Sequence, residues 1–99
     1  MPTFGNPQLK LLERLCNVIA VSGDESEVRK IVLEEIKPYA DEVKVDALGS
    51  VLATRQGRGR NRIRVMLDAH MDEVGLMIVT RKAKDSIVLK SSAGSMSEI

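Results

Sequence analysis

The stretch from Asp68 to Gly75 holds the residues best suited to chemistry, in the order Asp-Ala-His-Met-Asp-Glu-Val-Gly. His70 is the only histidine of the chain, and Asp72 follows it two positions later. Imidazole is a common metal ligand, and a carboxylate bound to its other ring nitrogen orients the ring and raises its basicity. In an extended segment, residues i and i+2 point to the same side, so both side chains can face one pocket. The spacing is compatible with His70 as a metal ligand and Asp72 as its partner. The competing interpretation is an exposed histidine satisfied by a nearby carboxylate.

Two amphipathic helices are predicted ahead of this stretch. Asn6-Pro7 is a typical helix start, with Asn6 as the N-cap. Apolar residues then recur at helical spacing, at Leu11, Leu12, Leu15, Val18 and Ile19. The sequence Ser22 to Glu25 indicates a capping box for a second helix, which Pro38 would end. Cys16 lies on the first apolar stripe, and we interpret it as a buried thiol.

Strands are expected from residue 42 onward. Alternation at 42–46, a turn ending at Gly49 and a returning strand at 50–55 predict a hairpin. From Arg62 the pattern alternates and then becomes continuously apolar through Leu67, which is typical of a strand that enters the centre of a sheet. Residues 73–80 and 87–90 are further strand candidates. The fold class we predict is α/β, with two N-terminal helices followed by a mixed β-sheet whose central strand carries His70.

Composition and charge narrow the function classes. The chain has 99 residues, enough for one domain, with 43% hydrophobic residues and a formal net charge of +1. That charge gives no support for nucleic-acid or membrane-surface binding. No apolar run approaches the length of a spanning helix. A single cysteine cannot form an internal disulfide, which fits a reducing compartment, so we expect a cytoplasmic protein.

A basic cluster precedes the predicted central strand. It consists of five arginines with glycines between them: Arg55, Arg58, Arg60, Arg62 and Arg64. Such a cluster can bind RNA or phosphate, but no stacking aromatic residue accompanies it. We therefore interpret it as a solvated hairpin loop that continues into the exposed face of a strand, and we expect no nucleic-acid partner.

The order of several motifs resembles the N-terminal part of the M42 family of metallo-aminopeptidases. They are Val21-Ser-Gly-Asp-Glu25, Asp46-Ala-Leu-Gly49 before a strand, and above all the run from Val65 to Ile78. The resemblance covers roughly Leu9 to Val79. It implies a partial zinc-peptidase-like (phosphorylase/hydrolase-like) fold, with residues 1–79 as the N-terminal part of a catalytic domain. Residues 80–99 depart from the family pattern, and we expect them to form a divergent, flexible tail.

The same resemblance implies an activity. Members of the family use two divalent metal ions, zinc or cobalt, to remove N-terminal residues from peptides, and they form cytoplasmic homo-oligomers, often tetrahedral dodecamers. By this resemblance His70 ligates one metal ion and Asp72 is the catalytic carboxylate. Ser50 departs from the asparagine that commonly follows the turn glycine in the family.

The remaining metal ligands and the general base of the family lie far downstream of the matching motifs. Residues 1–99 offer one convincing ligand, whereas a two-metal mechanism needs several that clamp both ions. We therefore expect at most a partial metal site and no activity from this chain alone. The alternative is a non-catalytic interaction module, or a truncated paralogue that assembles with a partner, because a sheet cut short exposes strand edges that can pair with another chain.

Overall fold

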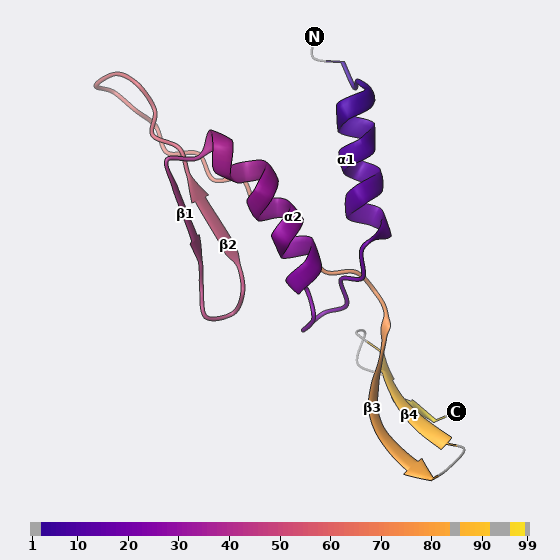
Figure 1. The fold of residues 1–99 in the computed structure, drawn as a ribbon. Coiled ribbons are helices and arrows are strands. Elements are labelled where there is room, and N and C mark those ends of the chain that lie inside the picture. Colours follow the sequence, from indigo (N-terminus) through magenta and orange to yellow (C-terminus); the bar gives the residue numbers. More distant parts are fainter. Residues whose placement is uncertain (1–2, 84–85, 92–95, 99) are drawn as a thin grey trace.

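The computed structural model describes residues 3–83, 86–91 and 96–98, and the side chains up to Val79. Two helices are followed by two hairpin-based sheets that lie apart from each other (Figure 1). The elements are α1 (Asn6–Asn17), α2 (Ser26–Ile36), the 3-10 helix η1 (Lys37–Tyr39), β1 (Glu42–Val45), β2 (Val51–Thr54), β3 (Leu76–Ala83), β4 (Ser86–Ser91) and β5 (Met96–Glu98). In the described part of the chain, no helix is long and apolar enough to cross a membrane.

Both predicted helices are confirmed, but the first begins one residue away from the expected cap. Gly5 is the N-cap of α1, and Asn6 is already helical. The reason is local, because the backbone N–H of Gly5 donates a hydrogen bond to Oε1 of Gln8 at 3.0 Å. The side chain of Gln8, in the first turn, thereby satisfies the N–H group of the N-cap residue, which has no partner within the helix.

The predicted Ser22 capping box of the second helix is wrong. Helix α2 begins at Ser26, and Glu25 is its N-cap residue. The carboxylate of Glu25 reaches back to accept a hydrogen bond from the N–H of Gly23 at 2.7 Å. The N–H of Asp24 donates to the carbonyl of Val21 at 2.8 Å. Residues 21–24 therefore form a tight turn that precedes the helix.

The sheets are antiparallel, so the predicted mixed sheet is wrong for the described residues. Strands β1 and β2 form the expected hairpin, with Val45 opposite Val51. Strands β3, β4 and β5 form a second antiparallel sheet. The parallel pairing that the structure contains is a single bridge between Val21 and Glu73. The α/β class itself holds.

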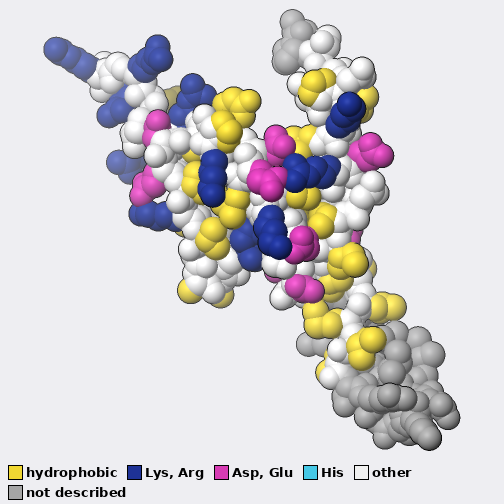
Figure 2. Space-filling view, viewed as in Figure 1, with side chains coloured by type: hydrophobic (Ala, Val, Ile, Leu, Met, Phe, Trp, Pro, Cys, Tyr) yellow, Lys and Arg dark blue, Asp and Glu magenta, His cyan; other side chains and the backbone are white. Residues whose placement is uncertain are grey.

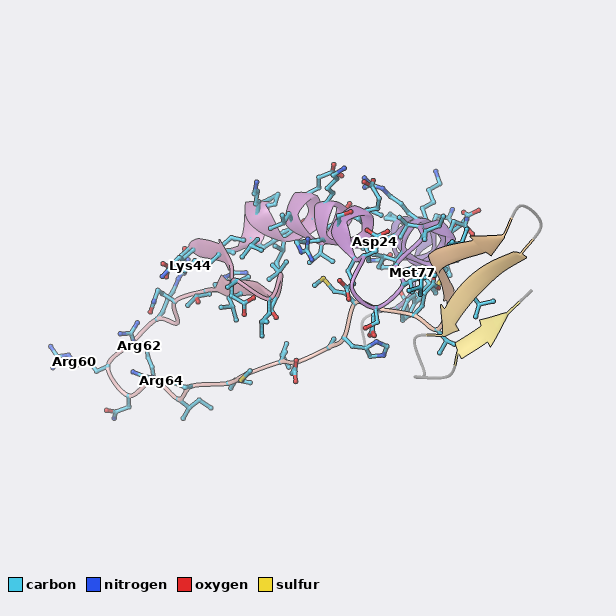
Figure 3. All side chains as sticks on the ribbon, turned by 90° about the horizontal axis from the view of Figure 1, so that it is seen from below. Asp24, Lys44, Arg60, Arg62, Arg64 and Met77 are labelled. Carbon is cyan, nitrogen blue, oxygen red and sulfur yellow. The ribbon has the colours of Figure 1, made fainter. Side chains whose placement is uncertain are left out.

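The expected central strand is not formed, and His70 is not carried by a strand. Residues 64–70 run as an extended trace that lies off both helices (Figure 3), and residues 71–72 return to the start of α2. The side chains that would fill a sheet core are exposed: Ile63 86%, Val65 73%, Met66 82% and Leu67 94%. A strand needs a neighbour for its backbone N–H and C=O groups. No described element lies alongside this segment to provide one.

The buried core is correspondingly small. Among the side chains that the structure describes, the buried apolar ones are Ala20, Val28 and Ile31, at the helix junction and on the inner face of α2. Cys16 is exposed, so the interpretation as a buried thiol is wrong. The radius of gyration is 18.5 Å, whereas a compact domain of this length has about 13 Å. No residue of helix α1 is fully buried, and Leu11, Leu15 and Val18 of its apolar stripe are half-buried.

Beyond Val79 the described backbone is in strands β3, β4 and β5. Residues 84–85, 92–95 and 99 lie outside the described part. The domain boundary at residue 79 and the flexible tail at 80–99 stay predictions.

Polar contacts fasten the first hairpin to α2. Nε of Arg29 donates a hydrogen bond to the carbonyl oxygen of Gly49, in the β1–β2 turn, at 2.6 Å. Oδ1 of Asp46 accepts hydrogen bonds from the N–H groups of Leu48 and Ser50, at 2.9 and 2.8 Å. Gly49 adopts a φ of 87°, which is accessible to glycine at little cost. The side chain of Arg29 therefore binds the backbone of the β1–β2 turn.

The substitution Gly49→Ala tests this attachment. The new Cβ would overlap the guanidinium of Arg29 and would also sit at a left-handed φ. We expect a loss of about 2–3 kcal/mol in the free energy of unfolding, from backbone strain and the lost hydrogen bond, measured by thermal or urea unfolding.

Gly59→Ala is the matched control, because Gly59 has a φ of 93° and a Cβ added there would have no other atom within 4 Å. It should lose only the strain, about 1–2 kcal/mol. Equal losses for the two variants would contradict a role for the Arg29 contact.

Candidate functional site

His70 and Asp72 form the pair that the sequence predicts. Nδ1 of His70 lies 3.1 Å from Oδ1 of Asp72 and 2.9 Å from the backbone carbonyl oxygen of the same residue. The imidazole is 86% exposed, and the aspartate side chain is 42% exposed. The i, i+2 spacing thus brings the two groups together as expected, although in a loop rather than at the end of a strand.

The hydrogen bonds determine which ring nitrogen is available to a ligand. A carbonyl oxygen can only accept, so Nδ1 must carry the proton that it shares with Asp72. The neutral ring then has its lone pair on Nε2, which no described residue contacts. A ligating histidine commonly shows this arrangement, with a carboxylate or carbonyl on one nitrogen and the metal on the other.

The loop that bears this pair is tied to the junction between the helices. The N–H of Glu73 donates to the carbonyl of Ala20 at 2.7 Å, and Glu73 forms a parallel bridge with Val21. Gly75 lies against the side chain of Val21 so closely that a Cβ there would be 2.5 Å from Cγ2. The segment that directly follows Asp72 is thereby positioned by residues 20–21.

A small hollow of about 120 Å³ adjoins Asp72. Its walls come from three places in the chain: the start of α2, the β1–β2 turn and the loop itself. They are Glu25, Arg29, Leu48, Gly49, Ser50, Met71 and Asp72. The contact between Arg29 and Gly49 therefore shapes the space beside the candidate catalytic carboxylate.

The donors present fit one corner of a metal site. A histidine with a free Nε2 and an orienting carboxylate supplies one ligand, whereas hydrolytic zinc sites have about three protein ligands. Among the described residues, no group of three His, Cys, Asp or Glu side chains is placed to hold a metal ion. Asp68 and Glu73 flank the pair in sequence and are exposed.

The arginine cluster lies in the long loop after β2, and Figure 3 shows Arg60, Arg62 and Arg64 well away from Asp24 and Met77. Figure 2 shows Lys and Arg side chains gathered over that tip of the molecule. Nη1 of Arg62 donates to the carbonyl of Gly57 at 3.0 Å, which closes the loop on itself. This geometry agrees with a solvated loop.

Sequence reasoning did not identify two residues that position the site, Arg29 and Gly75. Arg29 could not be identified from the local pattern, because its contact with Gly49 lies twenty positions away. Gly75 had a usable signal, since a glycine directly after an active-site run often marks a close backbone approach.

Comparisons with known proteins identify a family of aminopeptidases. The sequence model described as M42 glutamyl aminopeptidase matches residues 49–95. A putative aminopeptidase of Acetivibrio thermocellus is 44% identical over 68 residues, which are 69% of this chain and 20% of that protein. Lysyl aminopeptidase of Pyrococcus furiosus is 40% identical over 70 residues, 70% of this chain and 19% of that protein.

A solved structure is similar in fold. The TET aminopeptidase from the marine sediment archaeon Thaumarchaeota archaeon SCGC AB-539-E09 superimposes with a TM-score of 0.73 at 34% identity, over 87% of this chain and 24% of that chain. The chain spans about a fifth of the length of the curated relatives that it matches.

The first prediction from this geometry concerns the His70 ring. At about pH 8, where an imidazole is neutral, long-range ¹H–¹⁵N spectra should show the Nδ1–H form as the major tautomer, because two acceptors face Nδ1. Asp72→Ala should raise the share of the other tautomer, whereas Asp24→Ala, an aspartate with no described contact to the ring, should leave it unchanged. A major Nε2–H form in the parent chain would contradict the geometry.

The second prediction concerns the attachment of the loop. In Gly75→Ala the added methyl would meet Val21, whose branched side chain has little rotamer freedom. We expect the free energy of unfolding to fall by about 1–3 kcal/mol, together with amide exchange of Glu73 becoming faster. Gly57→Ala, whose Cβ would lie 3.4 Å from the flexible Arg62 side chain, is the control and should change both quantities little. Unchanged exchange in Gly75→Ala would show that the loop is held elsewhere.

Proposed function

Because the chain belongs to the M42 aminopeptidase family and matches the N-terminal portion of its members, we propose that it carries part of the catalytic centre of a dinuclear-metal aminopeptidase. The observation that carries the proposal is the His70–Asp72 pair, in which Nδ1 is bonded to the carboxylate and Nε2 has no hydrogen bond to any described residue. His70 would hold one of two divalent ions, zinc or cobalt. Asp72 would orient the ring and raise its basicity.

The bound metal ions would supply Lewis-acid activation of water and of the scissile carbonyl. The residues of this chain would contribute to that chemistry by positioning the metal ligand. Asp72 holds the proton at Nδ1, so that Nε2 keeps its lone pair, and the bond between Glu73 and Ala20 holds the loop that presents both side chains. The substrate would be a peptide with a free N-terminus. Either an acidic or a neutral first residue is compatible with this part of the site.

Residues 1–99 would be inactive by themselves. The described residues bring together one oriented ligand, and the other ligands and the general base would come from polypeptide outside this sequence. We further propose that the two helices and β1–β2 are a portion of a zinc-peptidase-like fold, which the TM-score of 0.73 to the TET aminopeptidase supports. A cytoplasmic homo-oligomer is the setting that we propose for the enzyme.

One observation favours a second candidate function. The exposed apolar side chains of Ile63, Val65, Met66 and Leu67 are the kind of surface by which an interaction module or a truncated paralogue would assemble with a partner. The two candidates differ in what His70 does, because assembly alone needs no ligand at that position.

A chimaera separates them. The aligned segment of lysyl aminopeptidase from Pyrococcus furiosus would be replaced by the matching 70 residues of this chain, and hydrolysis of aminoacyl p-nitroanilides would be measured with zinc or cobalt. We expect an active chimaera in which Asp72→Asn lowers kcat/KM by about 10- to 100-fold, the usual effect of removing the partner that orients a ligating histidine, and in which His70→Ala lowers it by at least as much.

Asp68→Asn in the same chimaera is the control, since this exposed aspartate lies two positions before the histidine. It should keep activity within about threefold of the unsubstituted chimaera, because surface changes usually have only small effects on the folded protein. A well-folded chimaera in which His70→Ala retains full activity would overturn the proposed role.

A further inference from the structure

An ion pair at the start of α2 forms part of the wall of the hollow beside Asp72. Oε2 of Glu25 lies 4.0 Å from Nη2 of Arg29, four residues later in the sequence. The two side chains are only 21% and 23% exposed, so water and salt screen their attraction less than they screen that of a surface pair. An acidic residue one turn before a basic one is also the favourable order along a helix. The pair therefore holds both side chains against the hollow.

Each member of this pair also binds the backbone of a different turn. Oε1 of Glu25 accepts a hydrogen bond from the N–H of Gly23 at 2.7 Å, within the turn formed by residues 21–24. Nε of Arg29 donates to the carbonyl oxygen of Gly49 at 2.6 Å, within the β1–β2 turn. The ion pair thus joins two turns that are far apart in the sequence.

Both joined turns adjoin the segment that carries Asp72. The 21–24 turn begins at Val21, which forms a bridge with Glu73, directly after Asp72. The β1–β2 turn lines the hollow of about 120 Å³ together with Asp72. Among the described residues, His70 is the one hydrogen-bond partner of the Asp72 carboxylate. The rotamer of Asp72 otherwise depends on the walls of this hollow.

We propose that Glu25 and Arg29 are positioning residues for the aminopeptidase reaction, which act through the two turns to keep the Asp72 carboxylate on Nδ1 of His70. The inference rests on the proposed function, because it concerns how well the imidazole is oriented for a metal ion. Without the Arg29 side chain, the β1–β2 turn would lose this attachment to α2 and the wall of the hollow would open. Asp72 could then turn away from the ring, and a misoriented ligand slows turnover.

Kinetics of the chimaera with lysyl aminopeptidase test this role, in a version that includes residues 20–75 of this chain. Arg29→Met removes both the ion pair and the bond to Gly49, and it should lower kcat by about tenfold while KM stays within about twofold. Arg29→Lys keeps the charge but not the planar fork of donors, so its kcat should lie between those of the parent and Arg29→Met. Glu25→Gln loses the charge yet can still accept the bond from Gly23, and it should lower kcat by about threefold.

A double variant and a matched ion pair separate positioning from a general loss of stability. Glu25→Gln combined with Arg29→Met should have the kcat of Arg29→Met alone, because both changes break the same pair. Glu27→Gln and Lys30→Met are the controls, since this second ion pair of α2, at 2.6 Å, has side chains that are 57% and 65% exposed and lies outside the hollow. Both controls should keep kcat within about twofold of the parent chimaera.

The tautomer of His70 gives a readout on the 99-residue chain that does not depend on activity. At about pH 8, Arg29→Met should raise the share of the Nε2–H form in long-range ¹H–¹⁵N spectra, in the same direction as Asp72→Ala. Lys30→Met should leave that share unchanged. Far-UV circular dichroism would check that each variant keeps the helices.

An Arg29→Met chimaera with the kcat of the parent, beside an inactive His70→Ala chimaera, would refute the positioning role and leave the proposed function intact. A raised KM at unchanged kcat would also refute it, because Arg29 would then act on substrate binding. Full activity of His70→Ala would end the proposed function and this inference together. An unchanged tautomer share in Arg29→Met would show that the pair does not hold Asp72, whatever the kinetics.

Discussion

The attachment of the 70–75 loop to the helix junction is the constraint on which the rest of the structure depends. Val21 and Gly75 are in contact, and the N–H of Glu73 bonds the carbonyl of Ala20. Ala20 is also among the few buried residues. These contacts place the His70–Asp72 pair near the junction of the two helices, although the hairpin and the arginine loop lie between them in the sequence. Strand β3 begins directly beyond it.

Elsewhere the elements are held together mainly by polar contacts at a few points. Arg29 joins α2 to the β1–β2 turn through Gly49. Arg14 of α1 forms ion pairs with Glu34 and Glu35 of α2, in exposed positions where such pairs contribute little. With so little apolar surface buried, the specific backbone contacts decide how the elements sit against one another.

Local pattern was enough to predict the helices and the first hairpin, but it failed for the strand at 62–67. A helix satisfies its own backbone, and the β1–β2 hairpin finds its partner a few residues away, so the sequence near each element contains the needed information. A central strand has its partners elsewhere, and alternation at Ile63 and Val65 indicates only that a partner strand could pack there. The same distinction explains the site. The pairing of His70 with Asp72 follows from i, i+2 spacing, whereas the contribution of Arg29 depends on a contact twenty residues away.

The geometry of the His70–Asp72 pair bears on how the proposed metal centre would be assembled. A ligand whose tautomer and orientation are already set loses less freedom when a metal arrives. Asp72 sets both for His70 before any further ligand is present, through two acceptors on one residue. The loop in turn takes its position from Ala20 and Val21. The orientation of the histidine is therefore encoded within residues 20–75, while further ligands of the proposed metal centre would have to come from outside this sequence. A metal ion would then select for the assembled state, because a single imidazole binds it weakly and a complete set of ligands binds it tightly.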